Sequence, residues 1–259
     1  MDNLAAARVA RAVRLASAVW FVVVAGCGGA EAIHGIGSNQ SSGDASTPTG
    51  EGGSGGSSTV PSQPAAPLTS AAADRMQLDA MRLRLEDLGP NWRREAASSS
   101  TSKCDPHPKG VKITAGSWKS RGVDYGFGTT AQIHSDAIVF ASAADAQRTV
   151  AANMKGSVIR CVKHELTQQF RKTARSVKLL GITSSVLRRH KVGDGLSGIR
   201  LTLNVSKGKK LYKFFVDAFL VRYNRALAEF TYMNAFQPAP TSTEYGLAET
   251  IAQRGALIQ

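Results

Sequence analysis

A stretch of 43 residues, positions 28–70, contains no Lys, Arg, Trp, Phe or Tyr, and this limits where the chain can fold. Gly, Ser, Thr and Pro dominate it, as in the run Gly-Gly-Ser-Gly-Gly-Ser-Ser at positions 52–58. Such a composition buries too little apolar surface to offset the entropy lost on ordering. We therefore expect a disordered tether with a root-mean-square reach of about 35–40 Å, followed by one folded domain at positions 71–259.

The residues before the tether have the pattern of an export signal. Three arginines lie within positions 8–14, and an apolar core follows at positions 15–24, which is too short to span a bilayer. The next residues, Val24-Ala25-Gly26-Cys27, resemble the lipobox of bacterial lipoproteins, whose cysteine receives a diacylglyceryl group. Two acyl chains suffice for stable anchoring. We expect positions 1–27 to be a lipoprotein signal peptide, with Cys27 as the lipidated residue; a simple membrane anchor or an ordinary secretory signal are the alternatives.

The domain at positions 71–259 is strongly basic, with 29 Lys and Arg against 15 Asp and Glu, a formal charge of +14. Export removes nucleic acid as the natural partner, and the basic residues are not interleaved with stacking aromatics. Outside the cytoplasm, anionic phospholipid headgroups or envelope polymers are the counter-charges available. The alternative is that the charge only aids solubility.

Two groups of basic residues flank the predicted strands and are the candidate ligand-binding residues. One group precedes Gly193, and the other lies on a turn and the strand after it. Repulsion within each group is costly unless the charges are solvated or meet an anion. The candidates are Arg188, Arg189, Lys191, Lys207, Lys209, Lys210 and Lys213.

Apart from Cys27, which we expect to be lipidated, the chain has two cysteines, Cys104 and Cys161, and export places them in a compartment that favours oxidation. An even pair there suggests a disulfide. Each cysteine also begins a Cys-x-x-His sequence, with His107 and His164, so a tetrahedral zinc site is the alternative.

The order of predicted elements indicates an α+β fold. A helix at positions 76–88 ends at Gly89-Pro90, and extended segments follow at 111–114, 126–133 and 138–140. Ser142 and Asp145 form a capping box for the next helix, which breaks near Gly156 before a second piece at 158–170.

The second half of the domain has the pattern of an antiparallel meander. Apolar and polar residues alternate at positions 199–205, which marks a half-buried strand. Strand signals also cover 176–190, 212–222 and 226–236, and Thr241-Ser242-Thr243-Glu244 has the signature of a cap for a final helix. We expect a mainly antiparallel sheet covered by two or three helices.

Several segments resemble the sensor-domain family of actinobacterial lipoproteins and the extracellular domain of mycobacterial receptor kinases of the PknH type. They are Leu85-Glu86-Asp87-Leu88-Gly89-Pro90-Asn91-Trp92, Val139 to Ala146, Cys161, Val192-Gly193-Asp194, Val221 to Arg225, and Leu247-Ala248-Glu249 with Arg254. The resemblance covers nearly all of 74–259 and implies a sensing domain. Those kinase domains carry two disulfides and a ligand cleft, whereas this domain can form one disulfide.

Motifs for catalysis are weak, and we expect no enzyme activity and no cofactor. His164-Glu165-Leu166-Thr167-Gln168 has Gln where a zinc protease needs its second His, so no metal site follows from it. Gly193-Asp194-Gly195 favours a turn over a phosphate loop. Histidines 107, 134, 164 and 190 are scattered, and Trp92 and Trp118 are expected to pack in the core.

Two functions remain open from the sequence. The first is a lipid-anchored, extracytoplasmic, non-catalytic domain that binds or senses an anionic envelope component. The alternative is a carrier that shelters an acyl chain in an apolar cavity. A carrier needs a continuous apolar cavity of the size of a drug molecule or larger, whereas a surface binder needs converging Lys and Arg side chains.

Overall fold

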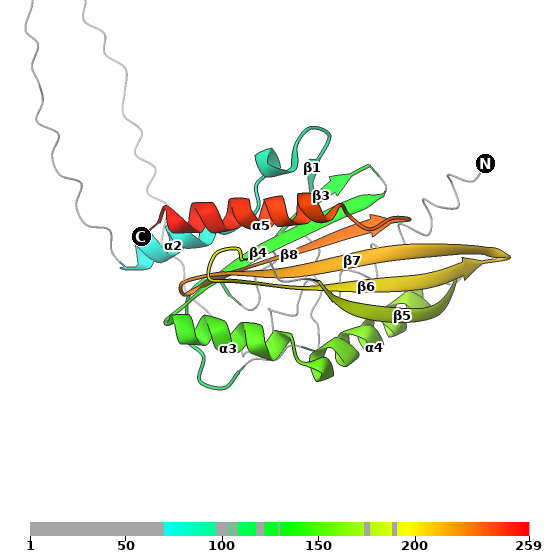
Figure 1. The fold of residues 1–259 in the computed structure, drawn as a ribbon, viewed down its shortest axis with the longest axis horizontal. Helices are drawn as coiled ribbons and strands as arrows, with labels where there is room; N and C mark the ends of the chain where they lie inside the picture. The colour runs from blue at the N-terminus through cyan, green and yellow to red at the C-terminus, as the bar shows by residue number, and fades with distance from the viewer. Residues whose placement is uncertain are drawn as a thin grey trace, which may run out of the picture. The chain divides into compact units, whose positions relative to one another are not determined.

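An antiparallel sheet lies between two layers of helices (Figure 1). The structure, a computed structural model, describes residues 70–96, 104, 108–117, 122–128, 130–173, 177–187 and 191–258. The predicted α+β class is confirmed, although four α-helices rather than two or three cover the sheet within these residues. One face carries α2 (Ser70–Ala80) and α5 (Thr241–Ala256), and the other carries α3 (Ala143–Asn153) and α4 (Gly156–Thr173).

Within the described residues the sheet has eight strands, seven of them in the order β1-β3-β4-β8-β7-β6-β5, and β2 pairs with β4. All of these pairings are antiparallel. The strands are β1 (Arg93–Glu95), β2 (Ile113–Ala115), β3 (Val123–Phe127), β4 (Ala131–Phe140), β5 (Lys178–Leu187), β6 (Gly195–Lys207), β7 (Lys210–Tyr223) and β8 (Ala226–Ala235).

The predicted meander is confirmed by β5 to β8, which are neighbours in the sheet as they are in the chain. Ile199, Leu201, Leu203 and Val205 are buried, and the four residues that alternate with them, Arg200, Thr202, Asn204 and Ser206, are half-buried. The buried set packs against α4. The extended segment expected at 126–133 is instead two strands, β3 and β4, because the chain turns near Gly128, whose φ of +55° suits glycine.

Ser142 caps α3 as predicted, with its Oγ accepting a hydrogen bond of 3.1 Å from the Asp145 backbone N–H. The expected capping box also needs the Asp145 carboxylate to accept from the Ser142 backbone N–H, and this second hydrogen bond is not among those at the start of α3. The Asp145 carboxylate instead pairs with Arg148 one turn along the helix. Hydrogen bonds from Arg148, and then from Ser142 and the Lys112 backbone, outweigh partial burial and hold the pKa of Asp145 below its usual value.

The predicted helix at 76–88 is wrong in its bounds. The helix α2 begins at Ser70 and ends at Ala80, and a separate 3-10 turn, η2, covers Leu85–Leu88. Between them, the Leu83 backbone N–H donates to Ser135 Oγ (3.0 Å) and its carbonyl accepts from Tyr125 Oη (2.8 Å). Side chains of the sheet therefore use the backbone groups that a continuing helix would need.

The predicted disulfide is present and joins the connection between β1 and β2 to α4. Cys104 and Cys161 are bonded, with 5.5 Å between their Cα atoms and a sequence separation of 57. Cys104 is buried beside Val158 and Val162 of α4. Because the bond uses both sulfur atoms, these cysteines are not available as thiolate ligands for zinc.

Candidate functional site: the basic end of the sheet

The β6–β7 hairpin reaches past α4 and α5 at one end of the sheet (Figure 1). Lys207 and Lys210 are paired across its two-residue turn, in which Gly208 has a φ of +58°. A glycine with positive φ at the first turn position gives the tight connection that matches strand twist. The sequence Lys-Gly-Lys-Lys therefore sets both the turn and its charge.

Lysines gather at this end from two neighbouring strand pairs. Lys209, Lys210 and Lys213 are exposed, and Lys207 is half-buried. An exposed lysine of β5, Lys178, lies opposite Ser206 of β6 and adds a charge that the sequence analysis did not assign to the group. We call these five residues the basic end: Lys178, Lys207, Lys209, Lys210 and Lys213.

The sequence around the basic end contains no acidic residue. Positions 166–187, 195–216 and 230–243 include no Asp and no Glu. The nearest acid along β7 is Asp217, which is buried and bound to Arg200. Since like charges opposite one another destabilise a hairpin, the Lys207–Lys210 pairing is the kind of local cost expected where a surface has a binding role.

The two groups of candidate residues do not form one site. Lys191 precedes the start of β6, whereas Lys207 ends it, so about 40 Å of strand separates them at ~3.3 Å per residue. Lys191 lines a shallow hollow with Asp194 and Arg222, and Arg222 donates to the Asp194 carbonyl (2.6 Å). Gly193 and Asp194 form the predicted turn. Arg188 and Arg189 lie outside the described residues.

A groove of about 430 Å³ opens at the basic end. Most of its lining is apolar or aromatic, and Lys213 and Asn204 add polar groups; the lining residues are Leu180, Asn204, Val205, Leu211, Tyr212, Lys213 and Phe236. Phe236 is held there by its backbone N–H, which donates to the Lys213 carbonyl (2.9 Å), and its ring is 6.3 Å from that of Tyr212. Its φ of +77° turns the chain sharply at the end of β8.

A second cluster, buried between β6, β7 and α5, was missed by the sequence analysis. Arg200 makes two hydrogen bonds to Asp217, from Nε to Oδ1 (2.6 Å) and from Nη2 to Oδ2 (2.7 Å). Its Nη2 is also 3.6 Å from Oε2 of Glu244. Both carboxylates are almost fully buried, while the Arg200 side chain is 18% exposed. These hydrogen bonds raise the pKa of Arg200, so it stays charged.

Glu244 is a buried partner in this cluster and not the cap that its sequence predicts. The residue before α5 is Pro240, and no side chain caps the helix. Burial, and then the neighbouring Asp217, raise the pKa of Glu244 to about 9, and Arg200 offsets this only in part. The Thr-x-x-Glu pattern is local, whereas the position of Glu244 follows from how α5 packs on the sheet.

The described histidines that were considered as catalytic or metal-binding candidates are either paired with a buried carboxylate or belong to no cluster of metal-ligating side chains within the described residues. His134 is buried, with Nδ1 2.6 Å from Oδ1 of Asp124. His164 is exposed on α4, and the part of the chain that the structure describes holds no cluster of three or more metal-ligating side chains. Trp92, expected in the core, is half-buried and packs against the edge of the core beside Phe127 and Tyr232. His107, His190 and Trp118 lie outside the described residues.

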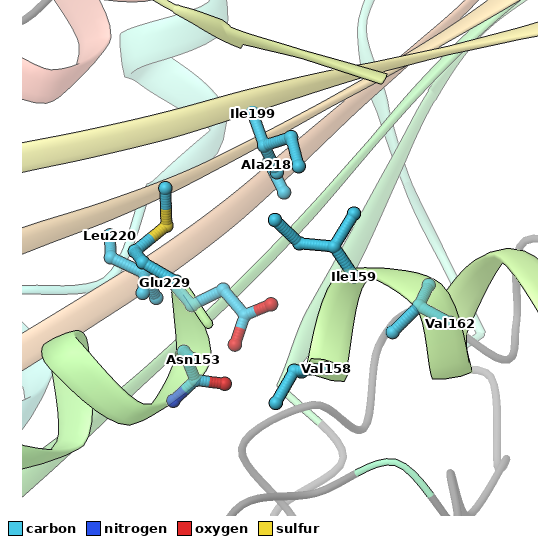
Figure 2. Close-up of a pocket in the computed structure, with 9 residues that line it drawn as sticks. Asn153, Val158, Ile159, Val162, Ile199, Ala218, Leu220 and Glu229 are labelled. Carbon is cyan, nitrogen blue, oxygen red and sulfur yellow. The ribbon is translucent and has the colours of Figure 1, made fainter. Parts of the chain in front are cut away.

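The apolar cavity between the helices α3 and α4 and the sheet is small. Figure 2 shows Val158, Ile159 and Val162 of α4 facing Ile199, Ala218 and Leu220 of the sheet. The space enclosed is about 30 Å³, enough for about one or two water molecules and far below the size of an acyl chain. This cavity does not support the carrier alternative.

Two features of the chain bear on contact with a membrane: the proposed lipidation site and the length of its apolar helices. Cys27 lies outside the described residues. Among the described residues, no helix has the length and apolar character needed to cross a bilayer.

Comparisons with known proteins give one distant similarity. Neither the models of protein families nor the curated protein sequences gave a match. Among solved structures, the fold is similar to the extracellular domain of PknH from Mycobacterium tuberculosis, at 10% sequence identity and a TM-score of 0.38. The similarity covers 70% of this chain and 95% of that one.

Proposed function

We propose that this chain is a non-catalytic, lipid-anchored domain outside the cytoplasm, which binds an anionic component of the cell envelope through the basic end. The observation that carries the proposal is a group of five lysines on adjoining strands, in a part of the sequence without acidic residues. Clustered charges of one sign attract and retain ligands of the opposite sign. The groove beside them supplies a concave surface.

The non-catalytic part of the proposal rests on what the buried polar residues do. His134 pairs with Asp124, and Arg200 pairs with Asp217, so these groups serve the packing of the sheet. The lysines of the basic end, in contrast, are on the surface. Attraction of an anion requires only their charge and position.

Binding of the protein to a soluble anionic polymer, inorganic polyphosphate, tests this proposal. The sheet, its four described helices and the disulfide all lie within residues 70–258, so a chain that begins at Gly28 retains them without Cys27. We expect it to bind inorganic polyphosphate with an affinity that falls as salt is raised through the screening range. Lys207→Gln/Lys209→Gln/Lys210→Gln should weaken binding about 100-fold, at roughly 1 kcal/mol per lysine.

A matched control separates position from net charge. Lys109, Lys112 and Lys155 are exposed and lie outside the basic end, so their replacement by Gln changes the net charge equally. The control variant should bind within about threefold of the parent. Equal losses in the two triple variants, or no binding at low salt, would remove the proposed function.

The anchoring part of the proposal needs a separate experiment, because it depends on Val24-Ala25-Gly26-Cys27 alone. Cells that make the full chain are supplied with a labelled fatty acid. The label should enter the parent chain and not the Cys27→Ser variant, since the cysteine sulfur carries the lipid. Equal labelling of both chains would contradict the lipidation of Cys27.

A further inference from the structure

Exposed apolar side chains lie among the lysines of the basic end. Leu211 is 72% exposed, Leu180 is 52% exposed and Phe236 is 43% exposed. All three line the same groove of about 430 Å³. Grouped apolar side chains on a surface mark a site of interaction, whereas isolated ones need no explanation. Solubility alone would not select this combination of leucines and lysines.

The charges are distributed over both faces of the hairpin. Residues that pair across antiparallel strands share a face, and successive residues alternate between faces. Lys207 and Lys210, which are paired, therefore lie on one face. Lys213, three positions after Lys210, lies on the other. A ligand lying flat on one face would leave part of these charges unused, but a surface that meets the hairpin end-on reaches all of them.

The arrangement of the layers leaves this end accessible. The turn of the hairpin projects past the ends of α4 and α5 (Figure 1). Exposed Arg171 and Lys172 in the last turn of α4 add positive charge within a five-residue connection of Lys178. Lys172 is six positions before Lys178, and six residues span at most about 22 Å, so these side chains belong to the same end of the molecule.

A lipid surface matches both features, and a hydrophilic polymer matches one. Anionic headgroups attract juxtamembrane lysines, while the boundary between headgroups and acyl chains accepts Leu and Phe side chains. A charged polymer offers nothing that would bury Leu211. Resting on the proposed function, we infer that the basic end docks end-on to a membrane containing anionic phospholipid, with Leu211, Leu180 and Phe236 entering the headgroup region.

The test uses vesicles and a matched pair of apolar variants. The chain that begins at Gly28 is mixed with vesicles of phosphatidylcholine alone, or of phosphatidylcholine with phosphatidylglycerol. We expect binding to the anionic vesicles only. Leu180→Gln/Leu211→Gln should reduce that binding at least tenfold, because each leucine loses favourable transfer from water. Polyphosphate binding by this variant should stay within about twofold of the parent.

Val186→Gln is the control for an exposed apolar residue. Val186 lies on β5 as Leu180 does, is 64% exposed and is opposite Ile199, away from the hairpin turn. It should bind anionic vesicles as the parent does. Thermal melting of each variant verifies that it is folded.

The outcomes separate this inference from the proposed function. One outcome is that the double leucine variant binds anionic vesicles like the parent while the triple lysine variant no longer binds polyphosphate. In that case the basic end recognises charge alone and the membrane inference is wrong. Equal binding to neutral and anionic vesicles would also overturn it. If the lysine variant binds both probes like the parent, the proposed function itself is wrong.

Discussion

Charged side chains are paired in one part of the β6–β7 ribbon and grouped by like sign in the other. Where α5 covers it, Arg200 and Asp217 neutralise each other, and Glu244 faces them from the helix. Beyond α5, lysines stand together with no acid in the neighbouring sequence. A buried charge must be paired to be tolerated, whereas exposed charges of one sign persist because water solvates them. The covered part is therefore built for stability, and the projecting part presents its positive charge at the surface.

The disulfide belongs to the covered part, and its loss should have the largest effect. Cys161→Ser opens a loop of 57 residues and should lower the free energy of unfolding by about 4 kcal/mol in the chain-entropy model. For a domain of this size the melting temperature should fall by roughly 10 °C. Thermal unfolding monitored by circular dichroism measures this.

Two controls make the disulfide prediction specific. The parent should show no free thiol at Cys104 or Cys161 until it is reduced, and a chelator should not change its melting temperature. Thiols that react without reductant, or stoichiometric zinc in the purified protein, would contradict the disulfide and favour the metal alternative.

Removal of the cation from the covered part should have the next effect. Arg200→Met leaves the Asp217 carboxylate buried without its two hydrogen bonds, which should cost about 3 kcal/mol, at the low end of the usual range because Arg200 is 18% exposed. Denaturant unfolding gives the value. The double variant Arg200→Met/Asp217→Leu should regain most of the loss, since apolar replacements of a buried pair are often tolerated. A double variant as unstable as the single one would show that charge pairing is not the cause.

The covered cluster should also make stability depend on pH. The pKa of Glu244 is raised to about 9 from 4.5, so its protonated form favours folding. That contribution is complete below pH 4.5, falls by up to about 1.4 kcal/mol per pH unit, and is gone above pH 9. Unfolding in denaturant at pH 5 to 9 should therefore show decreasing stability.

Glu244→Gln tests the cause of this pH dependence. The amide resembles the protonated carboxyl, so the variant should match the parent near pH 5 and exceed it near pH 9. The groups that face Glu244 are Asp217 of β7, Arg200 of β6 and Tyr232 of β8, and they are unchanged in the variant. An identical slope in the variant would assign the pH dependence to another group.

The sequence predicted what depends on local pattern and missed what depends on distant contacts. Alternation at 199–205, the Ser142 cap and the break at Gly156 required only neighbouring residues, and all three are present. The end of α2 at Ala80 depends on Ser135 and Tyr125, more than 40 positions away, which bind the Leu83 backbone. No local signal reports such contacts.

The candidate site shows the same limit. The lysines at 207–213 were identified from their spacing, but Lys178 was missed because only the register of β5 against β6 brings it to Ser206. The separation of Lys191 from Lys207 could have been predicted, because a strand of 13 residues lies between them. The length of the strand predicted between the two groups of basic residues would have shown that they cannot share one surface.

The smallest stability effect should come from the lysines themselves, and it completes the contrast along the ribbon. Lys207→Gln/Lys209→Gln/Lys210→Gln should change the free energy of unfolding by less than about 0.5 kcal/mol, because Lys209 and Lys210 are exposed, Lys207 is half-buried, and such surface side chains rarely affect folding more. Relief of the Lys207–Lys210 repulsion makes a small gain the expected sign. Adding salt should stabilise the parent slightly and the variant less, since screening removes a repulsion that the variant no longer has. A loss above 1 kcal/mol in denaturant unfolding would mean that these lysines hold the hairpin together, and their retention would then be explained by folding and not by binding.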